Sequence, residues 1–208
     1  MLFQSYIFIL LFFPLCLLGF WGLKRQKLLQ LWLIAFSLWF YGAASPYYLL
    51  LLLGSIAWNY AFFRAIERGI GRVIERVSGS AMERAEYGME RDSSRKRLLL
   101  GIGIAGNLAL LCFFKYFNAI SAGWSQMKGL EDPILQLALP LGISFFTFQQ
   151  IGFLADAYKG EVGACSLREY VLFVSFFPYV SSGPIVNAQE MLPQYRQIGR
   201  QRLDWAKF

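Results

Sequence analysis

The stretch that decides the fold is Leu28–Phe63, LLQLWLIAFSLWFYGAASPYYLLLLLGSIAWNYAFF, which contains no charged side chain. A helix needs about 20 apolar residues to cross a bilayer core of about 30 Å, so this stretch is long enough for two crossings. Gly42-Ala43-Ala44-Ser45-Pro46 is typical of a turn, and Pro46 suits the first position of a following helix. The stretch therefore predicts two membrane helices, over about 28–43 and 47–63.

Three further blocks carry no charge: Met1–Leu23, Pro133–Ala155 and Tyr170–Gln189. Because a charge at the bilayer centre costs at least a few kcal/mol, such blocks indicate lipid-embedded segments. The first lacks a basic n-region, so we expect a retained helix and not a cleaved signal peptide. The chain is thus predicted to be an all-α polytopic membrane protein, with about five transmembrane helices over 3–23, 28–43, 47–63, 98–122 and 133–157.

Lys and Arg residues alternate between the loops that these helices would leave. The loops carry three, none, nine, one and two of them in chain order, which by the positive-inside rule places the N-terminus outside the cell membrane. The sequence then divides into three N-terminal helices (1–63), a charged cytoplasmic segment (64–97) and a second membrane region (98–208).

The block from Arg168 to Asn187 is apolar but is broken by Pro178 and by Ser181-Ser182-Gly183-Pro184. Basic residues on both sides of it predict that both flanks lie on the cytoplasmic side. We therefore expect a re-entrant segment, which is tolerated at membrane depth where it is buried in protein or lines a wet cavity. The alternative is a kinked sixth span.

Within 64–97, Arg64, Arg68, Arg72 and Arg76 recur every four residues and form one basic arc of a helix. This pattern favours a helix at the membrane interface with its arginines on lipid phosphates. An extension of the preceding helix, packed on protein, is equally compatible with it, and residues 78–94 are expected to form a solvated loop. The net charge of +7 is concentrated beside membrane helices, so nucleic acid is not expected as a partner.

Polar residues gather at membrane depth in Pro140–Gln150, PLGISFFTFQQ. Ser144, Thr147, Gln149 and Gln150 fall within seven residues, and Asp156 follows, so this helix should face a protein interior or a tunnel. The chain has no histidine, and its three cysteines lack metal or redox spacing. We therefore expect no metal and no bound cofactor, and Ser144 has no nearby base that would make it a nucleophile.

Residues 140–161, PLGISFFTFQQIGFLADAYKGE, resemble the signature of membrane-bound O-acyltransferases, in the branch of the bacterial polysaccharide and alginate O-acetyltransferases. The resemblance continues through Phe176-Phe-Pro178, Gly183-Pro-Ile185 and Leu192-Pro-Gln194, and Lys115-Tyr-Phe-Asn118 also fits. Residues 64–97 depart from the branch by their length and charge, and so does Tyr179-Val-Ser-Ser182.

The resemblance implies half of a ring of about eleven membrane helices around a tunnel. An acyl group, most simply acetyl, would pass from acetyl-CoA or an acyl carrier to a hydroxyl of a cell-envelope polysaccharide, or to a periplasmic acetyltransferase partner. The family's essential histidine lies in its C-terminal half, so the resemblance implies an N-terminal part that is inactive alone. The residues expected to shape and line the tunnel are Ser144, Thr147, Gln149, Gln150, Asp156, Pro178, Gly183 and Pro184.

Two other functions are compatible with the same features. A re-entrant segment beside a polar helix would suit a non-catalytic scaffold or pore-like subunit, although the only candidate charges for a selectivity element are Asp156 and Lys115. A truncated form that regulates a full-length copy is a third alternative.

Overall fold

The computed structural model describes residues 6–23, 25–78, 82–128, 137–180 and 186–198, with the backbone alone described for 69–78, 82–92 and 180. These residues form helices and no strands. The elements are η1 (Phe8–Phe12), α1 (Phe13–Gly22), α2 (Gln26–Ala44), α3 (Pro46–Ser78), α4 (Met82–Met127), α5 (Ile143–Lys159), α6 (Leu167–Ser175), α7 (Phe177–Val180) and α8 (Ala188–Gln197). The predicted all-α membrane fold is confirmed.

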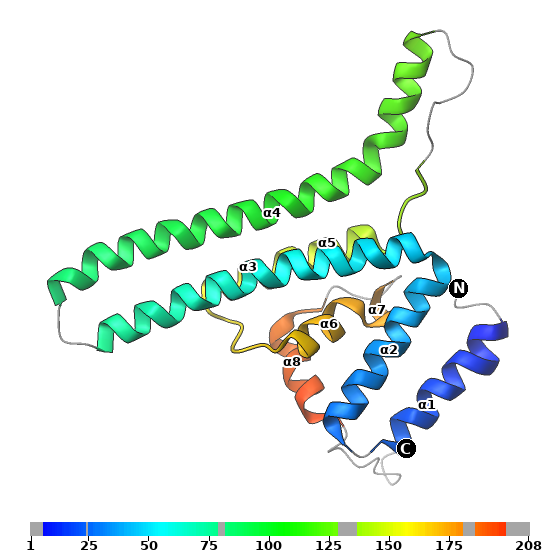
Figure 1. The fold of residues 1–208 in the computed structure, drawn as a ribbon, viewed down its shortest axis with the longest axis horizontal. Helices are drawn as coiled ribbons and strands as arrows, with labels where there is room; N and C mark the ends of the chain where they lie inside the picture. The colour runs from blue at the N-terminus through cyan, green and yellow to red at the C-terminus, as the bar shows by residue number, and fades with distance from the viewer. Residues whose placement is uncertain (1–5, 24, 79–81, 129–136, 181–185, 199–208) are drawn as a thin grey trace.

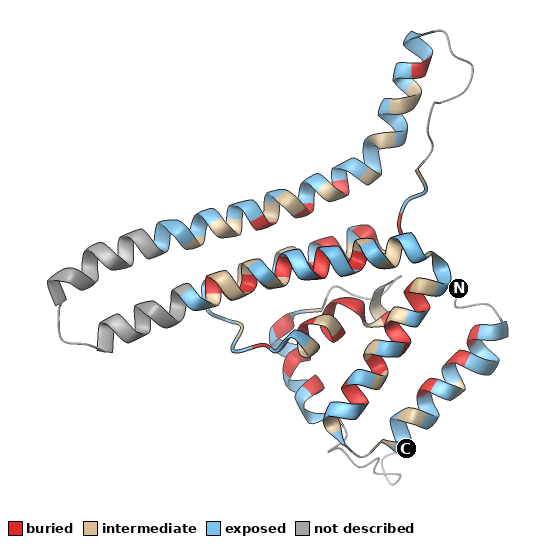
Figure 2. Ribbon diagram, in the orientation of Figure 1, coloured by how far each residue is buried: buried red, intermediate tan, exposed pale blue. Residues whose placement is uncertain are grey.

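α3, α4 and α5 lie side by side, and α2 with the short helices α6 to α8 packs against this layer (Figure 1). η1 and α1 form an outer helix that packs on α2. Buried residues follow the faces where these helices meet, and much of α1 and α4 is exposed (Figure 2). Large apolar side chains are among the exposed ones, as expected of helix faces that meet lipid.

Three described helical segments are long and apolar enough to cross a membrane: Gln26–Ala44, Pro46–Arg68 and Ser93–Met127. Phe8–Gly22 is a shorter apolar helix, and α5 has 17 residues. The structure therefore contains fewer full-length crossings among its described residues than the five helices predicted, although each predicted helix has a counterpart.

α3 and α4 continue well past the membrane segments predicted for them. α3 has 33 residues and α4 has 46, or about 50 Å and 69 Å at 1.5 Å per residue. Residues 64–78 extend α3 without a break, as the helix-extension alternative expects. The solvated loop predicted for 78–94 is wrong from Met82 onward, where the backbone is the first part of α4.

α5 begins at Ile143, ten residues later than the helix predicted to start at Pro133. Gly142 has φ +67°, a left-handed conformation that favours glycine, and it ends the non-helical approach formed by residues 137–142. Asn118 binds the backbone of Leu137 through both of its side-chain atoms, at 2.7 and 2.8 Å. The hydroxyls of Tyr48 and Tyr41 donate to the carbonyls of Ala138 and Leu141, at 2.7 and 2.6 Å. Side chains of α2, α3 and α4 thus provide hydrogen-bond partners for backbone groups that precede the first turn of α5.

The charged flanks of the helices meet at one end of the bundle, which we call the charged end. There Gln26 of α2 donates to the carbonyl of Arg196, and the Gln189 amide donates to the Glu161 carboxylate at 2.9 Å. Tyr60 of α3 donates to the carbonyl of Cys165 at 3.4 Å. The flanks that the Lys and Arg counts assigned to one side of the membrane are therefore adjacent in space.

The described flanks of the segment predicted to be re-entrant lie together at the charged end. α6 has nine residues, about 14 Å, which is too short to cross a bilayer by itself. α8 packs near the start of α6, where its Arg196 pairs with Glu169 at 2.8 Å. Both flanks therefore lie at the same end of the bundle, as the re-entrant hypothesis requires, and the re-entrant path itself stays a prediction.

Candidate functional site

A continuous chain of hydrogen-bonded polar side chains crosses the bundle through four helices, and we call it the polar chain. Tyr170 of α6 donates to Oε1 of Gln150 at 3.1 Å, and Nε2 of Gln150 donates to the Ser55 hydroxyl at 3.0 Å. One turn on, Asn59 donates to the Ser55 carbonyl at 3.0 Å and pairs reciprocally with Asn107 of α4 at 3.0 and 2.6 Å. All five residues are buried, so each polar group needs these partners.

The two glutamines predicted on α5 occupy different interfaces. Gln150 belongs to the polar chain, whereas Gln149 faces α6 and donates to the carbonyl of Phe173 at 3.0 Å. The side-chain oxygen of Gln149 finds no hydrogen-bond partner, and neither does the hydroxyl of Thr147. Thr147 and Gln149 are 0% and 2% exposed, which leaves two unpaired polar atoms inside the protein.

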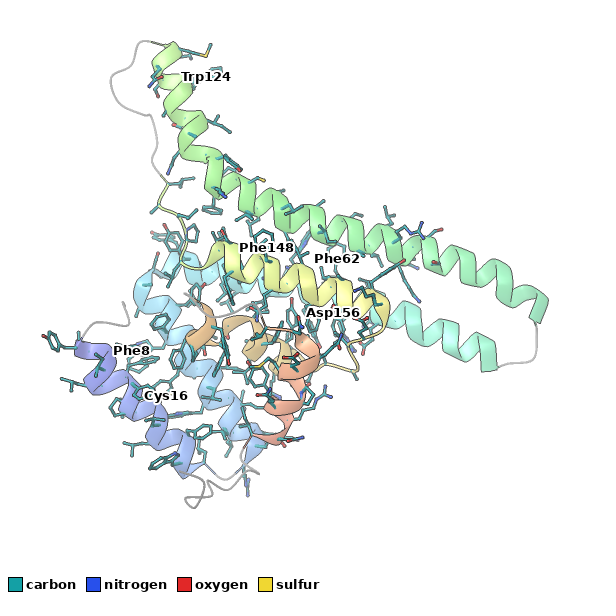
Figure 3. The ribbon with its side chains drawn as sticks, turned by 180° about the vertical axis from the view of Figure 1, so that it is seen from behind. Phe8, Cys16, Phe62, Trp124, Phe148 and Asp156 are labelled. Carbon is teal, nitrogen blue, oxygen red and sulfur yellow. The ribbon has the colours of Figure 1, made fainter. Side chains whose placement is uncertain are left out.

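Ser144 and Asp156 are not brought to the same place. Ser144 is exposed, whereas Thr147, three residues on, is buried. Asp156 is half-buried near the C-terminal end of α5 (Figure 3), where its backbone carbonyl accepts from Glu161 N at 2.9 Å. Their predicted roles in lining a tunnel stay predictions.

The break between α6 and α7 is held by α2. The Ser37 hydroxyl accepts from the backbone N–H of Phe177 at 3.3 Å. Phe177 is the first residue of α7, so this bond provides a partner for an N–H that has none within the helix. Pro178 follows in α7 and is exposed. Gly183 and Pro184, also predicted for this motif, lie outside the described residues.

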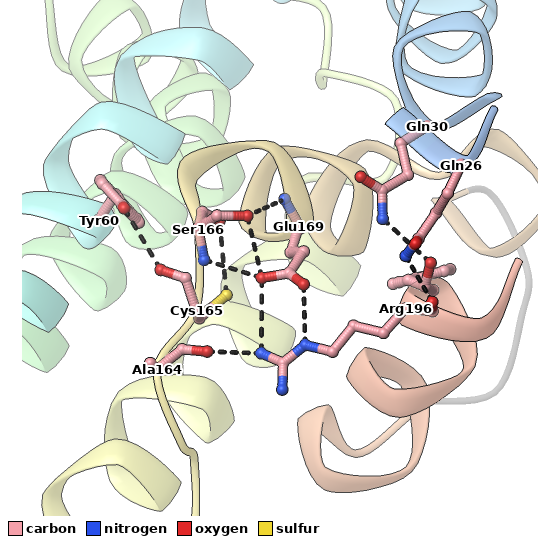
Figure 4. Close-up of polar contacts among 9 residues, drawn as sticks. Gln26, Gln30, Tyr60, Ala164, Cys165, Ser166, Glu169 and Arg196 are labelled. Carbon is pink, nitrogen blue, oxygen red and sulfur yellow. Dashed lines mark hydrogen bonds and ion pairs between the residues drawn. The ribbon is translucent and has the colours of Figure 1, made fainter. Parts of the chain in front are cut away.

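An open pocket of about 420 Å³ lies at the charged end. It is lined by the connection from α5 to α6 and by residues of α3, α6 and α8. Its lining residues are Arg64, Ala164, Cys165, Ser166, Glu169 and Arg196. Figure 4 shows the polar contacts of Ala164, Cys165, Ser166, Glu169 and Arg196.

Glu169 is the central acceptor of this pocket. Its carboxylate accepts from Ser166 N at 2.8 Å, from the Ser166 hydroxyl at 2.9 Å and from Arg196 Nε at 2.8 Å. Ser166 in turn accepts from Glu169 N, which completes a capping box at the start of α6. Burial acts to raise the pKa of Glu169, but the hydrogen bonds from Arg196 and Ser166 prevail and lower it.

Cys165 sits beside these groups but is not an activated thiol. Burial, with a smaller contribution from Glu169, raises its pKa to about 12. A thiol with so high a pKa carries almost no thiolate at neutral pH, and thiolate is the nucleophilic form. Among the described residues, no group of three or more histidine, cysteine, aspartate and glutamate side chains could hold a metal ion.

The four predicted interface arginines differ in what the structure says of them. Arg64 lines the pocket and pairs with Glu67 on its own helix. Arg68 is exposed. Arg72 and Arg76 belong to α3, but their side chains lie outside the description.

Several site residues were missed from the sequence. Ser37, Ser55 and Tyr170 look unremarkable inside apolar runs, because only the packing shows which buried group each must satisfy. Glu169 could have been found, since Ser166-x-x-Glu169 is the capping-box spacing. Its pairing with Arg196 depends on the return of α8, which no local pattern indicates.

The chain is 32% identical, over 99% of its length, to the peptidoglycan O-acetyltransferase of Helicobacter pylori. It is 32% identical, over 94% of its length, to the probable alginate O-acetylase of Pseudomonas putida. A shorter match, 31% identical over 28% of the chain and 14% of the relative, is to the teichoic acid D-alanyltransferase of Lacticaseibacillus rhamnosus. The matches confirm the resemblance that the sequence motifs predicted.

The chain covers 40% of the Helicobacter protein and 37% of the Pseudomonas putida protein, so it spans about two fifths of the length of these curated relatives. No family model matches the chain, and no solved structure matches it.

Proposed function

We propose that this chain, a homologue of the bacterial O-acetyltransferases of the membrane-bound O-acyltransferase family, is part of an enzyme that acylates a cell-envelope polysaccharide. An acyl group, most simply acetyl, passes from a cytoplasmic thioester to a hydroxyl through a transmembrane tunnel. The observation that carries the proposal is the similarity to enzymes named for this chemistry over 94–99% of the chain.

The residues of this chain contribute a scaffold and polar lining, and not the proton-transfer group. There is no histidine among its 208 residues, and burial raises the pKa of Cys165. α5 instead contributes two side-chain oxygens without hydrogen-bond partners, on Thr147 and Gln149, next to the broken helix α6–α7. Such groups suit the hydration or orientation of a polar substrate inside an apolar bundle.

The donor is proposed to be acetyl-CoA or an acyl carrier, approaching from the charged end. The acceptor is a polysaccharide of the cell envelope, or a periplasmic acetyltransferase that receives the acyl group first. Membrane lipid surrounds the helices, and nucleic acid has no place in the proposal.

Acyl transfer can be tested with membranes that contain the product of the complete native gene. These are incubated with acetyl-CoA labelled in its acetyl group, and purified peptidoglycan and alginate are offered as separate acceptors. We expect label in one polysaccharide and none when only the 208 residues are produced. Absence of label with either acceptor and any thioester donor would contradict acylation, and label with the 208 residues alone would contradict the assigned scaffold role.

The orientation is proposed with the N-terminus outside and the charged end in the cytoplasm. It can be read by labelling with a membrane-impermeant maleimide after exposed Cys112 is replaced by serine; Cys16 and Cys165 are buried. We expect Glu161→Cys to react only from the cytoplasmic side and Tyr47→Cys only from outside. The reverse pattern would place the charged end outside and exclude a cytoplasmic donor there.

A further inference from the structure

The pocket at the charged end is lined by charged side chains. Two arginines on separate helices reach it, Arg64 from α3 and Arg196 from α8, and Glu169 is the one carboxylate among its described lining residues. These lining residues have a formal charge of +1, and Glu67 pairs with Arg64 beside them. Because α6 starts at Leu167 beside Ser166, the positive end of its helix dipole also lies at the pocket.

Glu169 does not make the pocket acidic. Its two oxygens accept from Ser166 and Arg196, which holds the carboxylate in a closed set of contacts at the pocket wall. The Glu169 side chain is 13% exposed, against 43% for each of the two arginines. Of the charged side chains that line the pocket, the two guanidiniums are therefore more accessible than the Glu169 carboxylate.

Both guanidiniums retain donors beyond these contacts. The bonds drawn in Figure 4 use two of the three nitrogens of Arg196, which bind Glu169 and the Ala164 carbonyl. Glu67 contacts one nitrogen of Arg64, Nη1. A guanidinium has five N–H donors in a fork that matches an oxyanion, so each arginine can still bind one.

We propose that this pocket binds a phosphate group, held between Arg64 and Arg196 at the N-terminus of α6. Two guanidiniums that line one pocket from different helices can donate to different oxygens of one tetrahedral anion. The phosphate has two possible sources: a soluble ligand such as a nucleotide-bearing thioester, or the headgroup of an anionic lipid. Phosphate binding stands independently of acyl transfer, because it is measured without turnover.

The test compares variants of the complete protein in nanodiscs of zwitterionic phosphatidylcholine. Calorimetric titration with coenzyme A measures the soluble source. Native mass spectrometry of protein released from nanodiscs that also contain phosphatidylglycerol measures retention of the anionic lipid. Arg64→Gln removes one guanidinium but leaves the Arg196–Glu169 pair intact, and Arg64→Lys retains the charge without the fork.

Lys159→Gln is the matched control, because Lys159 is exposed at the charged end but does not line the pocket. We expect Arg64→Gln to weaken the binding about tenfold, Arg64→Lys to weaken it less, and Lys159→Gln to leave it unchanged. Binding of coenzyme A would identify a soluble ligand as the source of the phosphate. Retention of phosphatidylglycerol would identify a lipid headgroup as the source, and either result supports the site. Equal weakening by Arg64→Gln and Lys159→Gln, or no binding of either probe, would overturn it.

Discussion

Tyr170 donates its phenolic hydrogen to the side-chain oxygen of Gln150, 3.1 Å away, and both side chains are 0% exposed. The bond joins α6, the first helix of the re-entrant segment, to the motif helix α5. It also orients the Gln150 amide, since its other end donates to Ser55. The position of the re-entrant segment is therefore coupled to the polar chain that links α5 with α3 and α4.

Tyr170→Phe removes this hydroxyl without changing the shape of the ring. We expect a loss of about 1 kcal/mol in the free energy of unfolding, because the buried Gln150 oxygen loses its donor. Unfolding of the detergent-solubilised protein measures the change. Tyr158→Phe, on a half-buried residue of α5, serves as the control. Equal stability of the two variants would show that the bond adds nothing.

The Asn59–Asn107 pair is expected to couple α3 and α4. Asn59→Leu leaves the buried side-chain oxygen of Asn107 without its donor, at a cost of about 0.5–2 kcal/mol, while the Asn107 amide nitrogen keeps its bond to the Gly103 carbonyl. Because replacing both partners removes the unpaired group, the double variant should lose less stability than the two single losses combined. A double-mutant cycle measures this difference. Strictly additive losses would mean that the two amides act independently.

Gly19 allows α1 to approach α2 closely. A Cβ added there would lie 2.1 Å from the ring of Trp32, whose Nε1 donates to the Cys16 carbonyl at 3.3 Å. Gly19→Ala should therefore displace Trp32 and cost about 1–3 kcal/mol. Gly22→Ala on the same helix meets nothing within 4 Å and is the matched control. Trp32 fluorescence, with the other tryptophans replaced, reports the displacement, and identical spectra for both variants would contradict it.

The Glu169–Arg196 pair should make the flanks of the re-entrant segment sensitive to acid. The pKa of Glu169 is lowered from its ordinary value of 4.5 by Arg196 and Ser166, although burial opposes them. A lowered pKa stabilises the folded state fully above that ordinary value, and this stabilisation is lost as the pH falls through the folded-state value. The protection of α8 amides against hydrogen exchange, relative to their intrinsic exchange rate at each pH, should fall on acidification below about pH 4.5.

Glu169→Gln provides the control for this pH dependence. It retains the shape of the side chain but cannot titrate. The protection of α8 amides should therefore already be lower at neutral pH in this variant, and should change little on acidification. A loss of protection of the same size in the native protein and in Glu169→Gln would assign the acid sensitivity to another group.

The sequence predicted the fold class because that follows from where charge is absent and where it is concentrated. The basic flanks also indicated which helix ends lie together at the charged end, whereas the side of the membrane on which they lie stays a prediction. The sequence missed the helical backbone of 82–94, because a mixed run of Glu, Arg, Gly and Ser has no apolar stripe that indicates helix. It placed the start of α5 too early, because an apolar composition does not distinguish a helix from a non-helical segment, such as residues 137–142, that is held by side-chain hydrogen bonds.

The candidate site was harder to predict, and the reason is geometric. Gln149 and Gln150 are neighbours in sequence, yet they face different helices, so only the packing separates the residue in the polar chain from the one that binds Phe173. Ser144 shares a spacing with Thr147 but not its burial. Arg196 lies 27 residues from Glu169, and only the return of the chain brings them together.

That return has a consequence for reading the topology of longer relatives. Residues 167–197 contain an apolar stretch that a hydropathy plot would score as a crossing, yet the two flanks of this stretch lie together at the Arg196–Glu169 pair. A segment whose two flanks lie at the same end of the bundle leaves the number of membrane crossings unchanged. Counting it as a crossing would invert the compartment assigned to every loop that follows it.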